Sequence, residues 1–200
     1  MAITIDGSGT ITGINAGGLP DGIVDTDMLA DSAVSTAKLP SGTILQVVQG
    51  EELDDLSFSV SAQNTWKDIL STSITPVAAN SNILVMWYTS VSTATINQRG
   101  TLRLLRDSTA TVGVGNTEGS RLRGSHGSLL LTDFTTYSIP ASQNFMDDPT
   151  YILGDSITYK LQGGFEQSSG TLYVNRSATD TDVNTFHRGS TCMQLLEVAA

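Results

Sequence analysis

The sequence predicts an all-β protein whose main part is an antiparallel jelly roll or β-sandwich, preceded by a short N-terminal arm and neck. Only 15% of the 200 residues are charged, whereas 19 are glycine, and this pairing favours turn-rich β structure over exposed helices. From residue 43 onward, short runs rich in Ile, Val, Thr and aromatic residues are bounded by Gly, Asn, Asp or Pro, as in a sandwich or barrel. Hydrophobic residues make up 39% of the chain, which is enough to bury a core.

The first expected element is a pair of short strands in the leader, residues 2–14, which read AITIDGSGTITGI. Apolar residues alternate on both sides of a Gly-Ser-Gly turn, a pattern typical of a hairpin. These residues are Ile3, Ile5, Ile11 and Ile14. Because an isolated hairpin is marginally stable in water, the leader is expected to lie on its own body or on another protein. Residues 15–22, NAGGLPDG, then predict a linker.

Residues 21–42 contain a weak repeat: shifted by ten positions, Val24 falls on Val34 and Leu29 falls on Leu39. The apolar residues are loosely spaced as in a helix, and a Pro-Ser-Gly sequence ends the segment. A helix of this length is unstable alone, so burial against copies from neighbouring chains would be needed to stabilise it. This segment is therefore expected to form a short helical or repeat neck in an oligomer. The expected domains are 1–20 (arm), 21–42 (neck) and 43–200 (head).

Nine segments of the head are expected to be strands. They are 43–50, 64–76, 81–93, 100–109, 110–115, 127–140, 155–165, 170–177 and 190–200. The acidic run 51–59 is expected to be a loop or an edge segment, with a helix as the alternative. Gly163 and Gly164 indicate a bulge or a tight bend. Residues 83–88, ILVMWY, are apolar on both faces, as in a strand buried between two sheets or at a subunit interface, and the terminal MQLLEV is similar.

The formal net charge of −10 argues against a nucleic-acid partner, because phosphate backbones require clustered Lys and Arg. Five arginines in the middle of the chain are either solvated strand positions or an anion-binding patch. They are Arg99, Arg103, Arg106, Arg121 and Arg123. The single cysteine, Cys192, lies in an apolar run and is expected to be a buried small hydrophobe. No run is long and apolar enough to cross a bilayer, so no membrane insertion is expected.

No motif predicts catalysis, a cofactor or a metal, and the chain is not expected to be an enzyme. His126 and His187 lie in stretches rich in Gly and Ser, but a Gly-x-Ser-x-Gly elbow is missing. Three aspartate pairs lack the calcium-loop pattern and suit turns and caps better, with a structural calcium as the alternative. They are Asp25 with Asp27, Asp147 with Asp148, and Asp180 with Asp182. A glycan hydrolase could use Glu118, Glu166 and Asp133, but nothing in their spacing selects them.

The N-terminal quarter carries a resemblance to a known family. The leader ITIDGSGTITGI, the joint GLPDG, the unit SAVSTAKL and the phrase SGTILQVV closely resemble the N-termini of tailed-bacteriophage virion proteins. They resemble especially the fibre-like proteins of marine and cyanobacterial phages. The downstream phrases SITPVAANSNILVMWYTSVS and LRLLRDST resemble small phage jelly-roll domains, so the resemblance covers most of the chain.

The resemblance implies a virion structural protein that is made in the host cytoplasm. Residues 1–20 would dock on other tail or capsid proteins, with Ile3, Ile5, Ile11 and Ile14 as the docking residues. The head would be similar to trimeric tumour-necrosis-factor-like jelly rolls and could bind host surface glycans. The residues expected at the homotrimer interface are Val34, Leu39, Leu84, Met86, Tyr88 and Leu195.

The same resemblance leaves the place in the virion open. Two repeats rather than dozens favour a short tail fibre or a tail-tip component over a long fibre. The alternatives are a capsid-decorating protein, a glycan-degrading depolymerase, and a carbohydrate-binding β-sandwich unrelated to a virus.

Overall fold

The computed structural model describes residues 4–5, 11–12, 33–62, 65–95, 98–121, 123–131, 136–166 and 169–200. The chain divides into two compact units, Met1–Leu39 and Pro40–Ala200. The second unit therefore begins three residues before the expected start of the head at residue 43.

In the first unit, β1 (Thr4–Ile5) pairs antiparallel with β2 (Ile11–Thr12), and Ile5 lies opposite Ile11. This pairing confirms the two short strands expected in the leader. Ile3, Ile14 and the neck as far as residue 32 lie outside the described residues.

The described part of the neck forms no α-helix. Residues 33–42 contain only a 3-10 turn, η2 (Thr36–Lys38), followed by extended backbone at Leu39. Pro40 explains this ending, because the ring of a proline disfavours helical backbone at the residue before it. Over these residues, the expectation of a helix is wrong.

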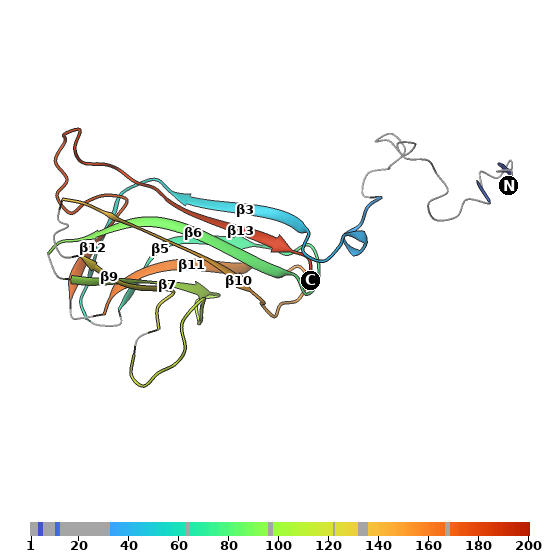
Figure 1. Cartoon of the computed structure of the whole chain (residues 1–200), viewed down its shortest axis with the longest axis horizontal. Coiled ribbons are helices and arrows are strands. Elements are labelled where there is room, and N and C mark those ends of the chain that lie inside the picture. Colours follow the sequence, from blue (N-terminus) through green and yellow to red (C-terminus); the bar gives the residue numbers. More distant parts are fainter. Residues whose placement is uncertain are drawn as a thin grey trace. The chain divides into compact units, whose positions relative to one another are not determined.

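Two antiparallel sheets make up the second unit (Figure 1). The larger sheet has six strands. Five of them follow the order β3-β13-β6-β12-β4, and the sixth, β10, pairs with β6. These strands are β3 (Ile44–Glu52), β4 (Leu56–Val60), β6 (Asn82–Thr93), β10 (Ile139–Asp147), β12 (Gly170–Val174) and β13 (Thr191–Val198). The smaller sheet has the order β5-β11-β7-β8, and β9 also pairs with β7. Its strands are β5 (Trp66–Ile74), β7 (Gln98–Arg106), β8 (Ala110–Val112), β9 (His126–Leu131) and β11 (Ile157–Phe165).

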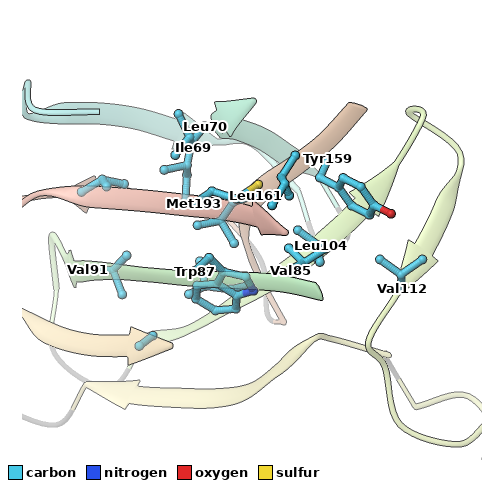
Figure 2. Packing of buried hydrophobic residues seen from close by; sticks show 14 of the residues in the cluster. Ile69, Leu70, Val85, Trp87, Val91, Leu104, Val112, Tyr159, Leu161 and Met193 are labelled. Carbon is cyan, nitrogen blue, oxygen red and sulfur yellow. The ribbon is translucent and has the colours of Figure 1, made fainter. Parts of the chain in front are cut away.

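The inner faces of the two sheets enclose one hydrophobic core, so the expected β-sandwich is confirmed (Figure 2). Along β6, Val85, Trp87 and Val91 are buried, and they belong to the same cluster as Leu161 of β11. Such alternation is what a strand with one buried face requires, since successive side chains point to opposite faces. Burial of each large aliphatic side chain contributes roughly 1.5–3 kcal/mol.

Two smaller expectations for the head can be checked. The acidic run 51–59 is confirmed as an edge segment, because it contains the end of β3 and most of β4, the last strand on its side of the sheet. Next to Gly163, the β11–β5 register shifts between Leu161 and Gln162, as it does at a β-bulge or another irregularity, and the extra residue, Ile69, lies on β5. Gly163 also permits close packing, because an added Cβ there would lie 2.5 Å from Leu172 Cδ2.

The sheets approach each other closely at one edge, where β3 faces β5. An added Cβ at Gly50 would lie 2.1 Å from Thr72 Oγ1, so only glycine fits here without movement. Thr72 is 6% exposed and its side chain fills the space that glycine leaves. The contact closes the sandwich along this edge.

A buried carboxylate on β13 holds the loop between β5 and β6. Glu197 is 0% exposed. Its oxygens accept hydrogen bonds from the backbone N–H groups of Val77 and Ala78 at 2.9 Å each, from Ser81 Oγ at 2.8 Å and from Gln46 Nε2 at 2.6 Å. Burial alone would raise the pKa of Glu197, but these four donors together lower the pKa below its ordinary value.

A second buried acid ties the two sheets at the end of β10. Asp147 Oδ2 accepts hydrogen bonds from Arg106 Nη1 at 2.6 Å and from the Tyr159 hydroxyl at 2.7 Å. Burial and the hydrogen bond to Asp147 raise the pKa of Tyr159 well above its ordinary range. Asp147 is therefore a structural ion-pair partner of Arg106.

Candidate functional site

The outer face of the six-stranded sheet carries a row of four apolar side chains. In register across β10, β6, β13 and β3, Met146 lies opposite Leu84, Leu84 opposite Leu196, and Leu196 opposite Val47. Met146 is 47% and Val47 is 57% exposed, whereas the two central residues are half-buried. We call these four residues the apolar row. Exposed apolar side chains that lie in one row across several strands make this face a candidate interaction site.

Farther along the same face, the surface becomes polar. Tyr88 is 50% exposed, and its hydroxyl lies 3.3 Å from Ser190 Oγ. Two adjoining hollows of about 260 and 420 Å³ share Tyr88 and Ser142 as lining residues. No charged residue lines either hollow among the residues that the structure describes. The outer face of β6 therefore changes from apolar at Leu84 to polar around Tyr88.

The residues expected at a trimer interface divide into three groups. Leu84, Met86 and Tyr88 lie on this outer face, because they occupy alternate positions of β6. Val34 (53% exposed) and Leu39 (half-buried) belong to the first unit.

The expectation that Leu195 lies at a trimer interface is wrong. Leu195 is 0% exposed and belongs to the hydrophobic core, so it cannot contact a partner in this fold. The neighbouring Leu196 points outward in its place. The run MQLLEV is apolar at both positions, and the sequence therefore did not distinguish the inward leucine from the outward one.

The second candidate region is the connection between β12 and β13, residues 175–190, which we call the 175–190 loop. Opposite charges hold this loop to the turn between β3 and β4. Asp55 lies 2.8 Å from Arg176 Nε and 3.0 Å from Arg188 Nη1, and Asp180 lies 2.8 Å from Arg188 Nη2. The guanidinium of Arg176 also lies over the ring of Tyr173, at 4.3 Å from its centroid.

Asn175 fixes the start of this loop. It has a positive φ of 63°, a conformation that asparagine tolerates better than most residues. Its side-chain amide donates to the carbonyl oxygens of Glu52 and Asp54 at 2.9 and 3.0 Å, and its Oδ1 accepts from Thr191 Oγ1 at 2.9 Å. Asn175, Arg176 and Ser177 match the Asn-x-Ser pattern of glycosylation sites, but the Asn175 side chain is only 1% exposed.

A polar hollow of about 270 Å³ lies between this loop and the segment before β10. We call it the loop hollow. Its lining consists of four hydroxyl side chains, one phenol and one imidazole: Thr136, Ser138, Ser177, Thr185, Tyr137 and His187. Tyr137 is 64% exposed and His187 is also exposed. The sequence indicates His187 as a candidate but does not connect it with Tyr137, because the two residues are 50 positions apart.

The two histidines do not share a site. His126 begins β9, and its ring packs edge-on against Trp87 with centroids 6.3 Å apart, whereas His187 lines the loop hollow. Within the described ranges, no group of three or more His, Cys, Asp or Glu residues could hold a metal ion. Cys192 is buried as expected, and burial raises the pKa of its thiol.

The three acidic residues that a glycan hydrolase could use are placed as follows. Glu118 is exposed and lies 3.7 Å from Arg121, Glu166 follows the end of β11, and Asp133 lies outside the described residues. Among the central arginines, Arg106 pairs with Asp147, and Arg103 donates to Gln162 Oε1 at 2.8 Å while its guanidinium lies over Trp66. These arginines therefore have partners within the protein.

Comparison with known proteins extends this picture little. No protein-family model matches the chain, and no curated protein matches it. Two similar solved structures are those of infectious bursal disease virus. The Gt strain structure has 18% identity and a TM-score of 0.37, covering 78% of this chain and 38% of that chain. The Gx strain structure has 16% identity and a TM-score of 0.38, covering 91% and 43%. The protein thus spans less than half of either of those chains. In the part of the chain that the structure describes, no helix is long and apolar enough to cross a membrane.

Proposed function

We propose that this protein is a homotrimeric structural protein of a bacteriophage virion, as a short tail fibre or tail-tip component. Residues 1–20 dock on another virion protein, the neck connects them to the head, and the β-sandwich head faces the host cell. The protein acts by binding and assembly rather than by catalysis, and its place is in the virion.

The apolar row carries this proposal. The chain has a net charge of −10, so copies of it repel one another wherever their acidic surfaces meet. The apolar row and the adjoining hollows offer an uncharged surface that crosses four strands. A second copy is therefore the partner that this surface suits best, since burial of Met146 and Val47 removes large exposed apolar side chains from water.

The leader supports the docking role. β1 and β2 have two residues each and form part of a compact unit separate from the sandwich. Strands this short have little stability in water, and pairing with a strand edge of a partner would supply it. The resemblance of residues 1–48 to phage virion proteins favours a virion protein as that partner.

The test is the solution mass of two forms, residues 1–200 and residues 43–200, by light scattering. We expect three times the chain mass of 21.1 kDa for the full chain, and a trimer for the shorter form as well. Monomers in both cases would overturn the trimer. Immunogold labelling of virions then separates the tail from the capsid, and labelling confined to the capsid would favour the capsid-decorating alternative.

A further inference from the structure

The length of the 175–190 loop indicates a function beyond connecting two strands. It joins β12 to β13 and, although the structure describes every one of its residues, contains neither strand nor helix. Loops longer than about 12–15 residues without secondary structure are uncommon in compact domains and usually carry function.

This loop is held in place before any ligand arrives. Arg188 bridges Asp55 and Asp180, Arg176 contacts Asp55, and Asn175 accepts a hydrogen bond from the backbone N–H of Gly189 at 2.7 Å. The two ends of the loop are thus tied to each other and to the turn between β3 and β4. A preorganised loop binds more tightly because less conformational entropy is lost on binding.

The loop hollow has the chemistry of a site for a neutral sugar. Its hydroxyl side chains can exchange hydrogen bonds with sugar hydroxyls, and the exposed rings of Tyr137 and His187 offer flat surfaces for the C–H faces of a pyranose. None of the six lining residues carries a permanent charge.

The nearby charges favour a neutral ligand over an anionic one. Arg176 and Arg188 are the sequence neighbours of the lining residues Ser177 and His187. Both arginines are paired with Asp55 and Asp180. A sulfated or carboxylated sugar would have to compete with these carboxylates for the guanidinium groups.

The position of the loop suits a ligand presented by a surface. Gly42, near the start of the second unit, donates to the carbonyl of Ala199 at 2.8 Å, so the chain enters the sandwich beside the end of β13. The 175–190 loop precedes the start of β13, which is eight residues long. At about 3.3 Å per residue, the loop is roughly 26 Å from the entry point, at the opposite end of the sandwich (Figure 1).

We propose that the loop hollow binds a neutral saccharide, with the Tyr137 ring as the stacking surface and His187 and the hydroxyl side chains as hydrogen-bonding partners. That the sugar belongs to a host surface rests on the proposed function, whereas the binding of a neutral saccharide by the loop hollow does not.

Saturation-transfer NMR on the full chain provides the test. The probes are the methyl glycosides of glucose, galactose, mannose and N-acetylglucosamine, with the glycoside of N-acetylneuraminic acid as an anionic comparison. We expect transfer to at least one neutral glycoside. Tyr137→Ala and His187→Ala should each weaken it at least tenfold, and Tyr137→Phe, which keeps the ring, should retain it.

Val183→Ala is the matched control, because Val183 is an exposed residue (46%) of the same loop that does not line the hollow. It should bind as the wild type does, and circular dichroism should show that every variant is folded. Transfer to none of the neutral glycosides, transfer to the anionic one alone, or transfer unaffected by Tyr137→Ala would overturn the proposal. Light scattering on the same samples keeps the two proposals apart: trimers without sugar binding contradict only this inference, and sugar binding by monomers contradicts only the trimer.

Discussion

At the scale of single residues, Glu197 shows how one buried acid can organise a loop. Its carboxylate accepts hydrogen bonds from two backbone N–H groups and two side chains, so removing it leaves several buried donors without partners. Ser81 is further held by Tyr151, whose hydroxyl accepts from the Ser81 N–H at 2.8 Å and donates to the Ala78 carbonyl at 2.7 Å. The loop between β5 and β6 is therefore structured by side chains far away in the sequence.

Glu197→Gln is expected to lower the free energy of unfolding by roughly 3 kcal/mol at pH 7, because a side-chain amide cannot accept from all of these donors. Urea denaturation measures the change. The exposed Glu51→Gln on β3 is the control and should leave the midpoint unchanged.

The same carboxylate predicts a pH dependence. Because the fold lowers the pKa of Glu197 below its ordinary value of 4.5, its contribution to stability is complete above that pH and is lost as the pH falls through the lower, folded pKa. Urea midpoints between pH 6 and pH 3 should therefore fall less steeply for Glu197→Gln than for the wild type. Equal slopes would show that Glu197 does not titrate with folding.

At the scale of elements, the contact between β3 and β5 depends on one glycine. Gly50→Ala places a Cβ where Thr72 Oγ1 now lies, and we expect a loss of about 1–3 kcal/mol in stability from overpacking. Adding Thr72→Ala removes that oxygen and should restore part of the loss. A double mutant as unstable as the sum of the single mutants would contradict this account of the edge. Denaturation of the wild type, the two single mutants and the double mutant completes the double-mutant cycle.

The ion pairs of the 175–190 loop give a second prediction at this scale. Arg188→Gln breaks the bridge between Asp55 and Asp180, both of which are partly exposed, so the midpoint of global unfolding should change little. Hydrogen exchange at the Gly189 amide, which bonds to the Asn175 carbonyl, should speed up several-fold because the loop opens more often. Unchanged exchange at Gly189 would mean that Asn175 and Arg176 hold the loop without Arg188.

At the scale of the whole molecule, assembly depends on the apolar row. Val47→Glu and Met146→Glu each place a charge in the apolar row, and on a chain with a net charge of −10 they should weaken self-association at least tenfold. Ser71→Glu on the exposed face of β5 adds the same charge to the other sheet and should leave assembly unchanged. Light scattering across a dilution series measures the effect. Equal dissociation for all three variants would move the interface away from the apolar row.

Some features of this molecule could be predicted from the sequence because they depend on neighbours in the chain. The run of apolar, β-branched and aromatic residues that indicates β6 and the alternation within residues 2–14 that indicates β1 and β2 are both local patterns. Strand periodicity is a property of a few consecutive residues, and turn residues act within four positions. The all-β class and most strand-bearing segments of the head were therefore determined by the sequence itself. β10 (Ile139–Asp147) is the exception, because most of its residues lie outside the expected strands and only its pairing with β6 makes it one.

Other features were decided only by the tertiary structure, because they join residues far apart in the chain. Leu195 and Leu196 are equivalent in the sequence, and the pairing of β13 with β6 decides which of them enters the core. Glu197 lies in an apolar run, yet its partners Val77 and Ala78 come from a loop some 120 residues earlier. Tyr137 and His187 meet in the loop hollow for the same reason. Such contacts form only when the whole chain closes into two sheets, since burial of the core fixes which strands are neighbours.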